Sequence, residues 1–288
     1  MSAAGSIAAD LAKRADAGLK LDTGLAEGIL TGFIRNELGK VGFERAVVAL
    51  SGGIDSALVC ALASKALGPK NVLAVMMPYR TSNPSSRADA EELISQLGVE
   101  SRLVDITGMT NPYFDRQPDI SNHRRGNVMA RMRMIVVYDH SEDFGGLVIG
   151  TSNKAEILLG YGTLFGDLAS AVNPIGDLFK TQVRQMARAM NLPVSIIDKP
   201  PSADLWEGQS DEEDLGMSYD DVDRILYLMF DERFRLSELL EAGFPEEQVT
   251  KVYSMVRRNQ FKRRPPIIAK ISDRTIEREF RYPRDWGL

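Results

Sequence analysis

A buried strand that breaks on two glycines and restarts as a helix is the feature that most constrains the fold of this chain. The apolar residues Val47–Leu50 predict a buried strand, and apolar positions recur at helical spacing from Asp55 to Leu67. Between them, Gly52 and Gly53 let backbone N–H groups approach a ligand, and the N-terminus of the following helix favours an anion. The segment therefore predicts an α/β unit with an anion-binding loop after a strand.

Further apolar runs alternate with helical segments along the chain. The other expected strands are Val72–Met77, Arg102–Ile106, Leu147–Ile149 and a short Val194–Ile197. Helices are expected at Leu25–Leu38, Pro84–Leu97, Gly126–His140, Lys180–Met190, Tyr219–Phe230 and, in two pieces, Leu236–Gln260. This alternation is typical of a parallel sheet covered on both faces. We expect an α/β fold with a doubly wound five-stranded parallel sheet of order 3-2-1-4-5 and a helical C-terminal part.

Two long segments carry few signals for a helix or a strand. Thr107–Arg125 is rich in Pro, Asn and Asp and is expected to be a loop. Pro200–Ser218 is expected to be a flexible functional loop, with its acidic cluster Asp211–Asp214 as a solvated face. We expect an N-terminal extension over residues 1–24 and a single domain over residues 25–288.

Composition and charge argue against several classes of partner. The formal charge is −5, and the one cysteine, Cys60, is expected to be a buried apolar residue of a protein from a reducing compartment. No apolar run approaches the roughly 20 residues that span a bilayer, and the N-terminus lacks the apolar core of a signal peptide. We therefore expect a cytoplasmic protein that binds no membrane.

A helix-turn-helix pattern over Leu236–Val256, followed by the basic run Lys262–Pro266, is compatible with DNA binding. Glutamates within that pattern, among them Glu246 and Glu247, would face phosphates with the wrong sign. We therefore expect no nucleic-acid partner.

A carboxylate next to an anion-binding loop needs an explanation. Asp55 would repel a phosphate unless a divalent cation lay between them, and Mg²⁺ prefers one or two carboxylates together with phosphate oxygens. Glu156 follows the strand Leu147–Ile149, so both carboxylates would border the crevice between strands 1 and 4. The alternative is that the glycines form a plain tight turn and that Asp55 only caps a helix.

These residues also carry a resemblance to a known family. SGGIDS (Ser51–Ser56) resembles the pyrophosphate loop of the N-type ATP pyrophosphatases, which adenylate a substrate and release pyrophosphate. Five later segments narrow the resemblance: GNVMARMRM (Gly126–Met134), GTSNKAEILLGYGTLFGD (Gly150–Asp167), NPIGDLFKTQVRQMA (Asn173–Ala187), KPPSADLW (Lys199–Trp206) and QFKRRPP (Gln260–Pro266). In this order they are similar to the segments of ammonia-dependent NAD⁺ synthetases.

The resemblance implies a homodimeric carbon–nitrogen ligase that uses ATP and Mg²⁺ to convert nicotinic acid adenine dinucleotide (deamido-NAD⁺) to NAD⁺. ATP would adenylate the nicotinate carboxylate with loss of pyrophosphate, and ammonia would then displace AMP. A lysine and a metal ion are suited to neutralise the charge of the leaving pyrophosphate. Neither histidine of the chain falls in a matching segment, and neither receives a role.

The resemblance also implies roles for particular residues. ATP would contact Ala49, Leu50, Ser51, Gly52, Gly53, Ile54, Asp55, Ser56, Arg80, Thr151, Lys180 and Ser202. Mg²⁺ would bind Asp55 and Glu156, and deamido-NAD⁺ would contact Arg131 and Lys262. The catalytic residues would be Asp55, Lys180 and Asp167, while Arg80 has a plain surface arginine as its alternative.

The chain departs from the family pattern at three positions near the dinucleotide site. Leu164 stands where many members have a lysine, Ala171 where they have an aspartate, and Phe261 where they have a histidine. These departures affect the binding of deamido-NAD⁺ rather than the chemistry of ATP. Because no amidase segment precedes the first core helix, we expect free ammonia as the nitrogen donor.

Two other functions remain open from the sequence. One is a different adenylating enzyme with an SGGxDS loop, such as a tRNA-modifying protein or an amidotransferase synthetase subunit. The low basic charge and the one cysteine argue against tRNA. The other is a nucleotide-binding protein without catalysis, which would not need the metal pair of Asp55 and Glu156.

Overall fold

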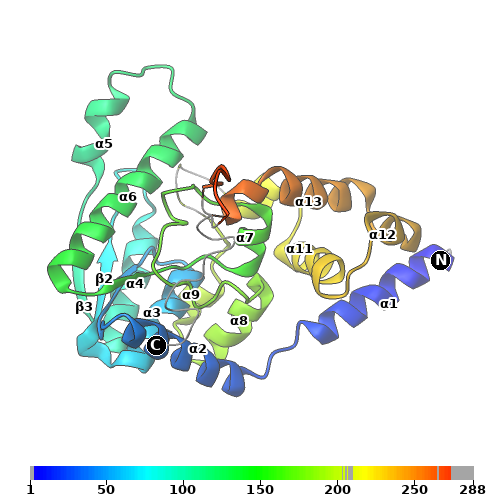
Figure 1. The fold of residues 1–288 in the computed structure, drawn as a ribbon, viewed down its shortest axis with the longest axis horizontal. Coiled ribbons are helices and arrows are strands. Elements are labelled where there is room, and N and C mark those ends of the chain that lie inside the picture. Colours follow the sequence, from blue (N-terminus) through cyan, green and yellow to red (C-terminus); the bar gives the residue numbers. More distant parts are fainter. Residues whose placement is uncertain (1–2, 203, 205, 207–209, 265, 274–288) are drawn as a thin grey trace.

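A four-stranded parallel sheet lies at the centre of the part of the chain that is described. The computed structural model describes residues 3–273, except 203, 205, 207–209 and 265. The strands are β1 (Ala46–Ala49), β2 (Val72–Met76), β3 (Glu100–Leu103) and β4 (Leu147–Ile149), in the order β3-β2-β1-β4 (Figure 1). Val48 of β1 is in register with Ala74 of β2 and with Ile149 of β4. The carboxyl ends of β1 and β4 are therefore neighbours.

Helices cover both faces of this sheet. One face packs against α2 (Thr23–Lys40), α3 (Ile54–Leu67), α4 (Pro84–Leu97), α8 (Lys180–Ala189) and α9 (Val194–Ile197). The other face packs against α5 (Thr107–Phe114) and α6 (Asn122–Phe144). Alternate residues of β1 point to opposite faces of the sheet. Val48 packs in the hydrophobic core on the α3 face, and Val47 packs in the core on the α6 face. The doubly wound α/β class expected from the sequence is thus confirmed.

The expected fifth strand is wrong. Val194–Ile197 forms the short helix α9, in which the carbonyl of Pro193 accepts hydrogen bonds from the N–H groups of Ile196 and Ile197. Beside β4, the described residues contribute only an isolated parallel bridge between Ile149 and Val172. An apolar run of four residues does not distinguish a strand from a helix, and Pro193 favours a helix start.

The expected loop over Thr107–Arg125 is also wrong at both of its ends, because a helix forms in its first half and α6 already begins at Asn122. Residues Thr107–Phe114 form α5, although the helix contains Pro112. Thr110 and Phe114 are buried, and the ring of Phe114 lies edge-on to Tyr79 with a centroid separation of 6.2 Å. Burial against the sheet outweighs the weak helix propensity of this segment.

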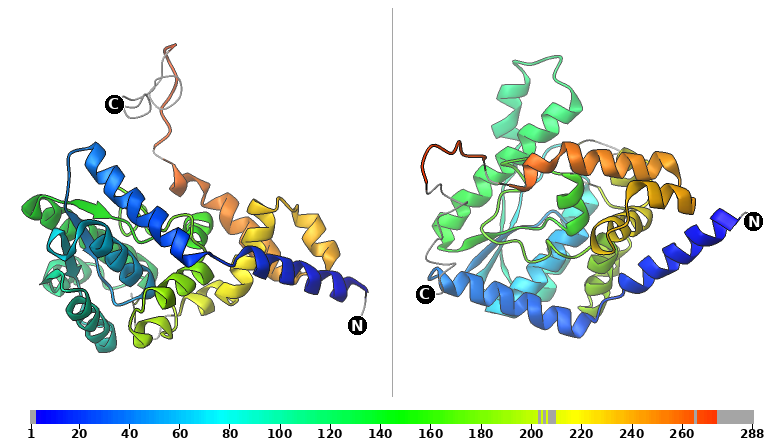
Figure 2. Two further views of the ribbon diagram at one scale, coloured as in Figure 1. Left: turned by 90° about the horizontal axis from the view of Figure 1, so that it is seen from below. Right: turned by 45° about the vertical axis from the view of Figure 1, so that its right-hand side comes forward.

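A second, helical cluster lies beside the sheet. It comprises α1 (Ala3–Gly18), α7 (Lys154–Leu159), α10 (Asp211–Leu215), α11 (Tyr219–Leu226), a π-helical turn (Tyr227–Asp231), α12 (Leu236–Ala242) and α13 (Glu246–Arg258). The N-terminal helix α1 belongs to this cluster, where it packs against α11, the π-helical turn and α12 (Figure 2). Arg14 of α1 pairs with Glu232, and Asp16 pairs with Arg224 of α11.

Short 3₁₀ turns at Pro69–Asn71 and Gln260–Arg263 complete the elements of the described chain. None of its helices has both the length and the apolar character that a bilayer span requires. The expected single domain over residues 25–288 includes a tail from residue 274 that lies outside the described residues.

Candidate active site

The glycine loop follows β1 and leads into the first turn of α3. Gly52 has a φ angle of +80°, and a Cβ atom at this position would collide with the backbone carbonyl of Ser86. Only glycine suits both conditions. The Ser56 hydroxyl donates to the carbonyl of Gly53 at 3.0 Å and accepts from the N–H of Ser51 at 3.2 Å. The serines therefore fix the loop from within, and α3 points its N-terminus at the space above it.

Two carboxylates that are far apart in the chain converge beside this loop on one lysine. The Nζ atom of Lys180 lies 2.5 Å from Oδ2 of Asp55 and 3.7 Å from Oε1 of Glu156. Asp55 and Glu156 stand in the first turns of α3 and α7, where a helix favours negative charge. Lys180 begins α8, where a helix disfavours positive charge, and the carboxylates offset that cost.

Asn153 holds the two carboxylates in place. Its Nδ2 atom donates to Oδ1 of Asp55 at 2.9 Å, and its Oδ1 atom accepts from the N–H of Glu156 at 3.0 Å. The N–H of Asn153 donates to Oε2 of Glu156, which completes a capping box at the start of α7. Asn153 was not among the residues expected at the site, although the spacing Asn-Lys-Ala-Glu is typical of a capping box.

The cluster contains two acidic side chains and one basic side chain. Burial lowers the pKa of Lys180, but Asp55 and Glu156 more than reverse this effect and raise it. Burial, followed by repulsion from Asp55, raises the pKa of Glu156 to about 8. One lysine therefore does not fully neutralise this pair, and a further cation would relieve the repulsion.

The residues present fit a magnesium ion. Asp55 and Glu156 supply hard carboxylate oxygens, the ligand type that Mg²⁺ takes together with phosphate oxygens and waters. Across the described ranges, no group of three or more His, Cys, Asp or Glu side chains is arranged to hold a metal. A cation at this site would thus depend on ligands from a bound nucleotide.

The acidic cluster Asp211–Asp214 is a solvated face only in part, because Glu213 and Asp214 are exposed but the first two acidic residues are not. Asp211 is buried, and its carboxylate accepts a hydrogen bond from the hydroxyl of Tyr161 at 3.1 Å. Glu212 accepts from the N–H of Tyr219 at 3.0 Å. The ring of Tyr219 lies below Lys180, with its centroid 5.1 Å from Nζ. The segment thus closes one side of the site, and no periodicity in the sequence signalled it.

The remaining expected ATP contacts lie on several elements of the fold. Ala49, Leu50 and Ile54 form the strand and helix ends of the glycine loop, and Thr151 follows β4. The hydroxyl of Ser202 accepts from the N–H of Asp204 at 3.1 Å. Arg80 is exposed after β2, and its guanidinium lies 5.7 Å from the ring centroid of Tyr79. No contact of the described residues assigns Arg80 to a ligand.

The expected dinucleotide contacts gather at the other end of α7. Lys262 donates to the carbonyls of Gly160 and Gly162, each at 2.8 Å. Arg131 donates to the carbonyl of Leu164 at 3.2 Å, and Asp167 accepts from the N–H of Thr163 at 2.8 Å. All three therefore meet the segment 160–167, which links them to Glu156 through one short helix.

A cavity of about 280 Å³ lies along this same stretch. Its lining includes Ser152, Asn173 and Lys262. The Oδ1 atom of Asn173 is buried and has no hydrogen-bond partner among the described residues. The cavity therefore offers polar groups between the carboxylate end and the Lys262 end of α7.

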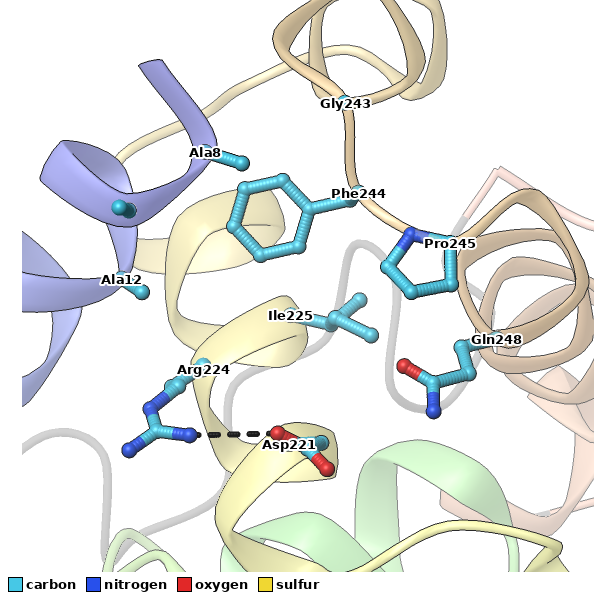
Figure 3. A pocket seen from close by; sticks show the side chains of 10 residues that line it. Ala8, Ala12, Asp221, Arg224, Ile225, Gly243, Phe244, Pro245 and Gln248 are labelled. Carbon is cyan, nitrogen blue, oxygen red and sulfur yellow. Dashed lines mark hydrogen bonds and ion pairs between the residues drawn. The ribbon is translucent and has the colours of Figure 1, made fainter. Parts of the chain in front are cut away.

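A second cavity, of about 360 Å³, lies away from these residues, between α1, α11 and the turn that precedes α13 (Figure 3). Ala8, Ala12 and Phe244 form its apolar walls, and Arg224 donates to Asp221 at 3.2 Å on its floor. None of its lining residues belongs to the expected site, so it is no candidate for the chemistry.

Comparisons with known proteins agree with this arrangement. A family model described as NAD synthase matches residues 28–266. The NH(3)-dependent NAD(+) synthetase of Trichlorobacter lovleyi is 58% identical over 269 residues, which are 93% of this chain and 98% of that protein. A solved NMN synthetase from Francisella tularensis has a TM-score of 0.78 at 28% identity, covering 88% of this chain and 100% of that one. A solved NH3-dependent NAD synthetase from Campylobacter jejuni has a TM-score of 0.74 at 32% identity, covering 87% and 100%.

Proposed function

The chain belongs to the NAD synthase family, and from this premise we propose that it amidates deamido-NAD⁺ with ammonia to give NAD⁺. It is a carbon–nitrogen ligase with ATP as co-substrate. An oxygen of the nicotinate carboxylate attacks the α-phosphorus of ATP, and pyrophosphate leaves. Ammonia then attacks the carbonyl carbon of the acyl-adenylate, AMP leaves, and one proton is released.

The convergence of Asp55 and Glu156 on Lys180 beside the glycine loop carries this proposal. Backbone N–H groups of Gly52 and Gly53 hold phosphate oxygens, and Lys180 neutralises the leaving pyrophosphate. Asp55 and Glu156 would hold Mg²⁺, which screens the phosphate charge when bound. Asp167 lies in the segment 160–167 that follows α7, where it positions the nicotinate or the ammonia.

The second substrate, deamido-NAD⁺, extends from this centre along α7. Arg131 and Lys262 are cations that contact the segment 160–167, and they suit the phosphates of the dinucleotide. Leu164, Ala171 and Phe261 take the places of family contacts, so the grip on deamido-NAD⁺ depends on other side chains. The expected position of Arg80 over the adenine stays a proposal.

The test is product formation from ATP, deamido-NAD⁺ and ammonium with Mg²⁺. We expect pyrophosphate, AMP and NAD⁺ in equal amounts, with pyrophosphate release lowered by about 100-fold or more in Asp55→Asn. Omission of deamido-NAD⁺ or Mg²⁺ should abolish release. ATP binding without turnover would support a non-catalytic nucleotide-binding protein, and turnover that requires tRNA would support another adenylating enzyme.

One relative favours a second candidate substrate. The Francisella tularensis structure with the highest TM-score quoted above is an NMN synthetase, so a nicotinic acid mononucleotide is the natural competitor. The identities of 54–58% to several NH(3)-dependent NAD(+) synthetases favour the dinucleotide. Parallel assays with the two substrates at equal concentration decide between them by kcat/KM.

The finer expectations about assembly and location are also proposals. We propose a homodimer, supported by the exposed apolar residues Leu25, Ile29 and Phe33, which lie four positions apart along one face of α2. Light scattering on the purified chain tests it, and a monomer at micromolar concentration would contradict it. The single free Cys60 supports a reducing, cytoplasmic location.

A further inference from the structure

Phe165 has a positive φ angle, a backbone conformation that the neighbouring Gly166 would adopt more easily. The N–H of Gly166 donates to the carbonyl of Thr163 at 2.9 Å, which closes a four-residue turn with Phe165 in its third position. The φ angle of Phe165 is +59°. A positive φ in this position favours glycine or asparagine, yet the glycine follows one residue later. For a bulky aromatic residue such a conformation is an outlier.

The other non-glycine residues with positive φ in the described part of the chain have ordinary explanations. Asn191 and Arg233 each follow the end of a helix, where a left-handed residue closes the last turn. Asp204 is of a residue type that tolerates this region. Phe165 has neither explanation, so its conformation points to a function of the side chain.

The turn itself is held firmly against α6. The hydroxyl of Thr163 donates to Oδ1 of Asn127 at 2.8 Å, and Arg131 binds the carbonyl of Leu164. A Cβ atom on Gly166 would lie 3.1 Å from Cβ of Ala130, so the backbone packs closely there. These contacts explain why glycine stands at position 166 and how the conformation of Phe165 is maintained.

The ring of Phe165 does not contribute to the core. Its residue is 58% exposed, and it belongs to none of the buried clusters. A single exposed aromatic residue is common on protein surfaces. An exposed aromatic residue with a strained backbone is uncommon, because its ring adds nothing to the stability of the fold.

The turn lies among the residues that the proposed function assigns to deamido-NAD⁺ and its chemistry. It lies between Arg131, which contacts Leu164, and Asp167, which contacts Thr163. Lys262 binds the same segment at Gly162. We propose that Phe165 is the stacking platform for the pyridinium ring of deamido-NAD⁺, an inference that rests on the proposed function. A cationic ring is attracted to an aromatic face, and Asp167 adds a negative charge two residues away.

The test uses Phe165→Gly, because this change removes the ring and relieves the backbone at once. We expect the KM for deamido-NAD⁺ to rise about tenfold, with the KM for ATP changed less than about twofold, while the melting temperature rises. Phe165→Tyr keeps the ring and should keep the wild-type KM. Arg233→Gly is the matched control: it relieves the same φ in an exposed residue and should raise the melting temperature with no change in either KM.

A direct binding measurement separates this inference from the proposed function. Calorimetry with nicotinic acid mononucleotide, which carries the pyridinium ring without adenine, should show affinity about tenfold weaker in Phe165→Gly than in the wild type. Unchanged affinity would overturn the stacking role, whether or not the wild type makes NAD⁺. A lower melting temperature together with a changed oligomeric state would instead assign the ring to a contact between two copies of the chain.

Discussion

The ammonium group of Lys180 lies 2.5 Å from the carboxylate of Asp55, although 125 positions separate the two residues in the chain. The same ammonium lies 3.7 Å from Glu156. In the free protein this lysine thus holds together two carboxylates that would otherwise repel each other. The contact joins the glycine loop, α7 and α8 into one site, and it links stability to catalysis.

Replacement of Lys180 by methionine should therefore damage both properties. Removal of one partner from a buried ion pair leaves uncompensated charge, so we expect the free energy of unfolding to fall by about 3 kcal/mol. Pyrophosphate release should become undetectable. Urea unfolding and a pyrophosphate assay measure the two effects.

Lys154 offers a matched control, because it also contacts two carboxylates and the face of an aromatic ring. Its partner Asp177 has a side chain that is 95% exposed, whereas that of Asp55 is 16% exposed. Water screens the Lys154 pairs, so Lys154→Met should cost less than about 1 kcal/mol and leave activity within about threefold. Equal losses in the two variants would contradict a special role of Lys180.

Substitution of Gly52 by alanine should disrupt the loop more than its φ angle alone explains. The added methyl group meets the carbonyl of Ser86, a backbone atom that cannot turn away. We expect a loss of at least about 3 kcal/mol and of ATP binding. Gly98→Ala isolates the cost of the backbone conformation, since Gly98 is left-handed with a φ of +67° and no atom lies within 4 Å of the new methyl group. That control should cost about 1 kcal/mol.

The stability of the protein should depend on pH through Asp223. This residue is 0% exposed and accepts from the N–H of Thr181, and burial raises its pKa to about 6. The folded state thus binds the proton more tightly than the unfolded chain. The stability that the proton contributes is fully present below about pH 4 and is lost as the pH rises through about 6.

Asp223→Asn lacks this loss, so its free energy of unfolding relative to the wild type should rise by about 2 kcal/mol between about pH 4 and pH 6.5. Urea unfolding at several pH values measures the difference. The exposed Asp220→Asn on the same helix separates burial from simple removal of charge. A constant difference between Asp223→Asn and the wild type would contradict the raised pKa.

The centre of the site was predictable because local and long-range signals agree there. The apolar run before Gly52 and the helical spacing after it specify the strand, the loop and the helix. The alternation of strands and helices places β1 beside β4, so the convergence of Asp55 and Glu156 follows from topology. Their metal ligation remains a prediction.

Other features depend on contacts that the sequence does not record. Val194–Ile197 is too short for periodicity to distinguish a strand from a helix. The burial of Asp211 depends on Tyr161, 50 positions earlier, so an acidic run gave no sign of it. The positive φ angle of Phe165 has no signal in the sequence, because the glycine expected at the third position of the turn stands at the fourth, as Gly166.

The most direct test of the account follows an oxygen atom. Deamido-NAD⁺ labelled with ¹⁸O in its nicotinate carboxylate is converted with ATP and ammonium, and the AMP is analysed by mass spectrometry. If the carboxylate attacks the α-phosphorus at the site formed by Asp55, Glu156 and Lys180, each AMP carries one labelled oxygen, and Asp55→Asn or Glu156→Gln yields almost no AMP. Unlabelled AMP, or normal AMP yield from both variants, would contradict it.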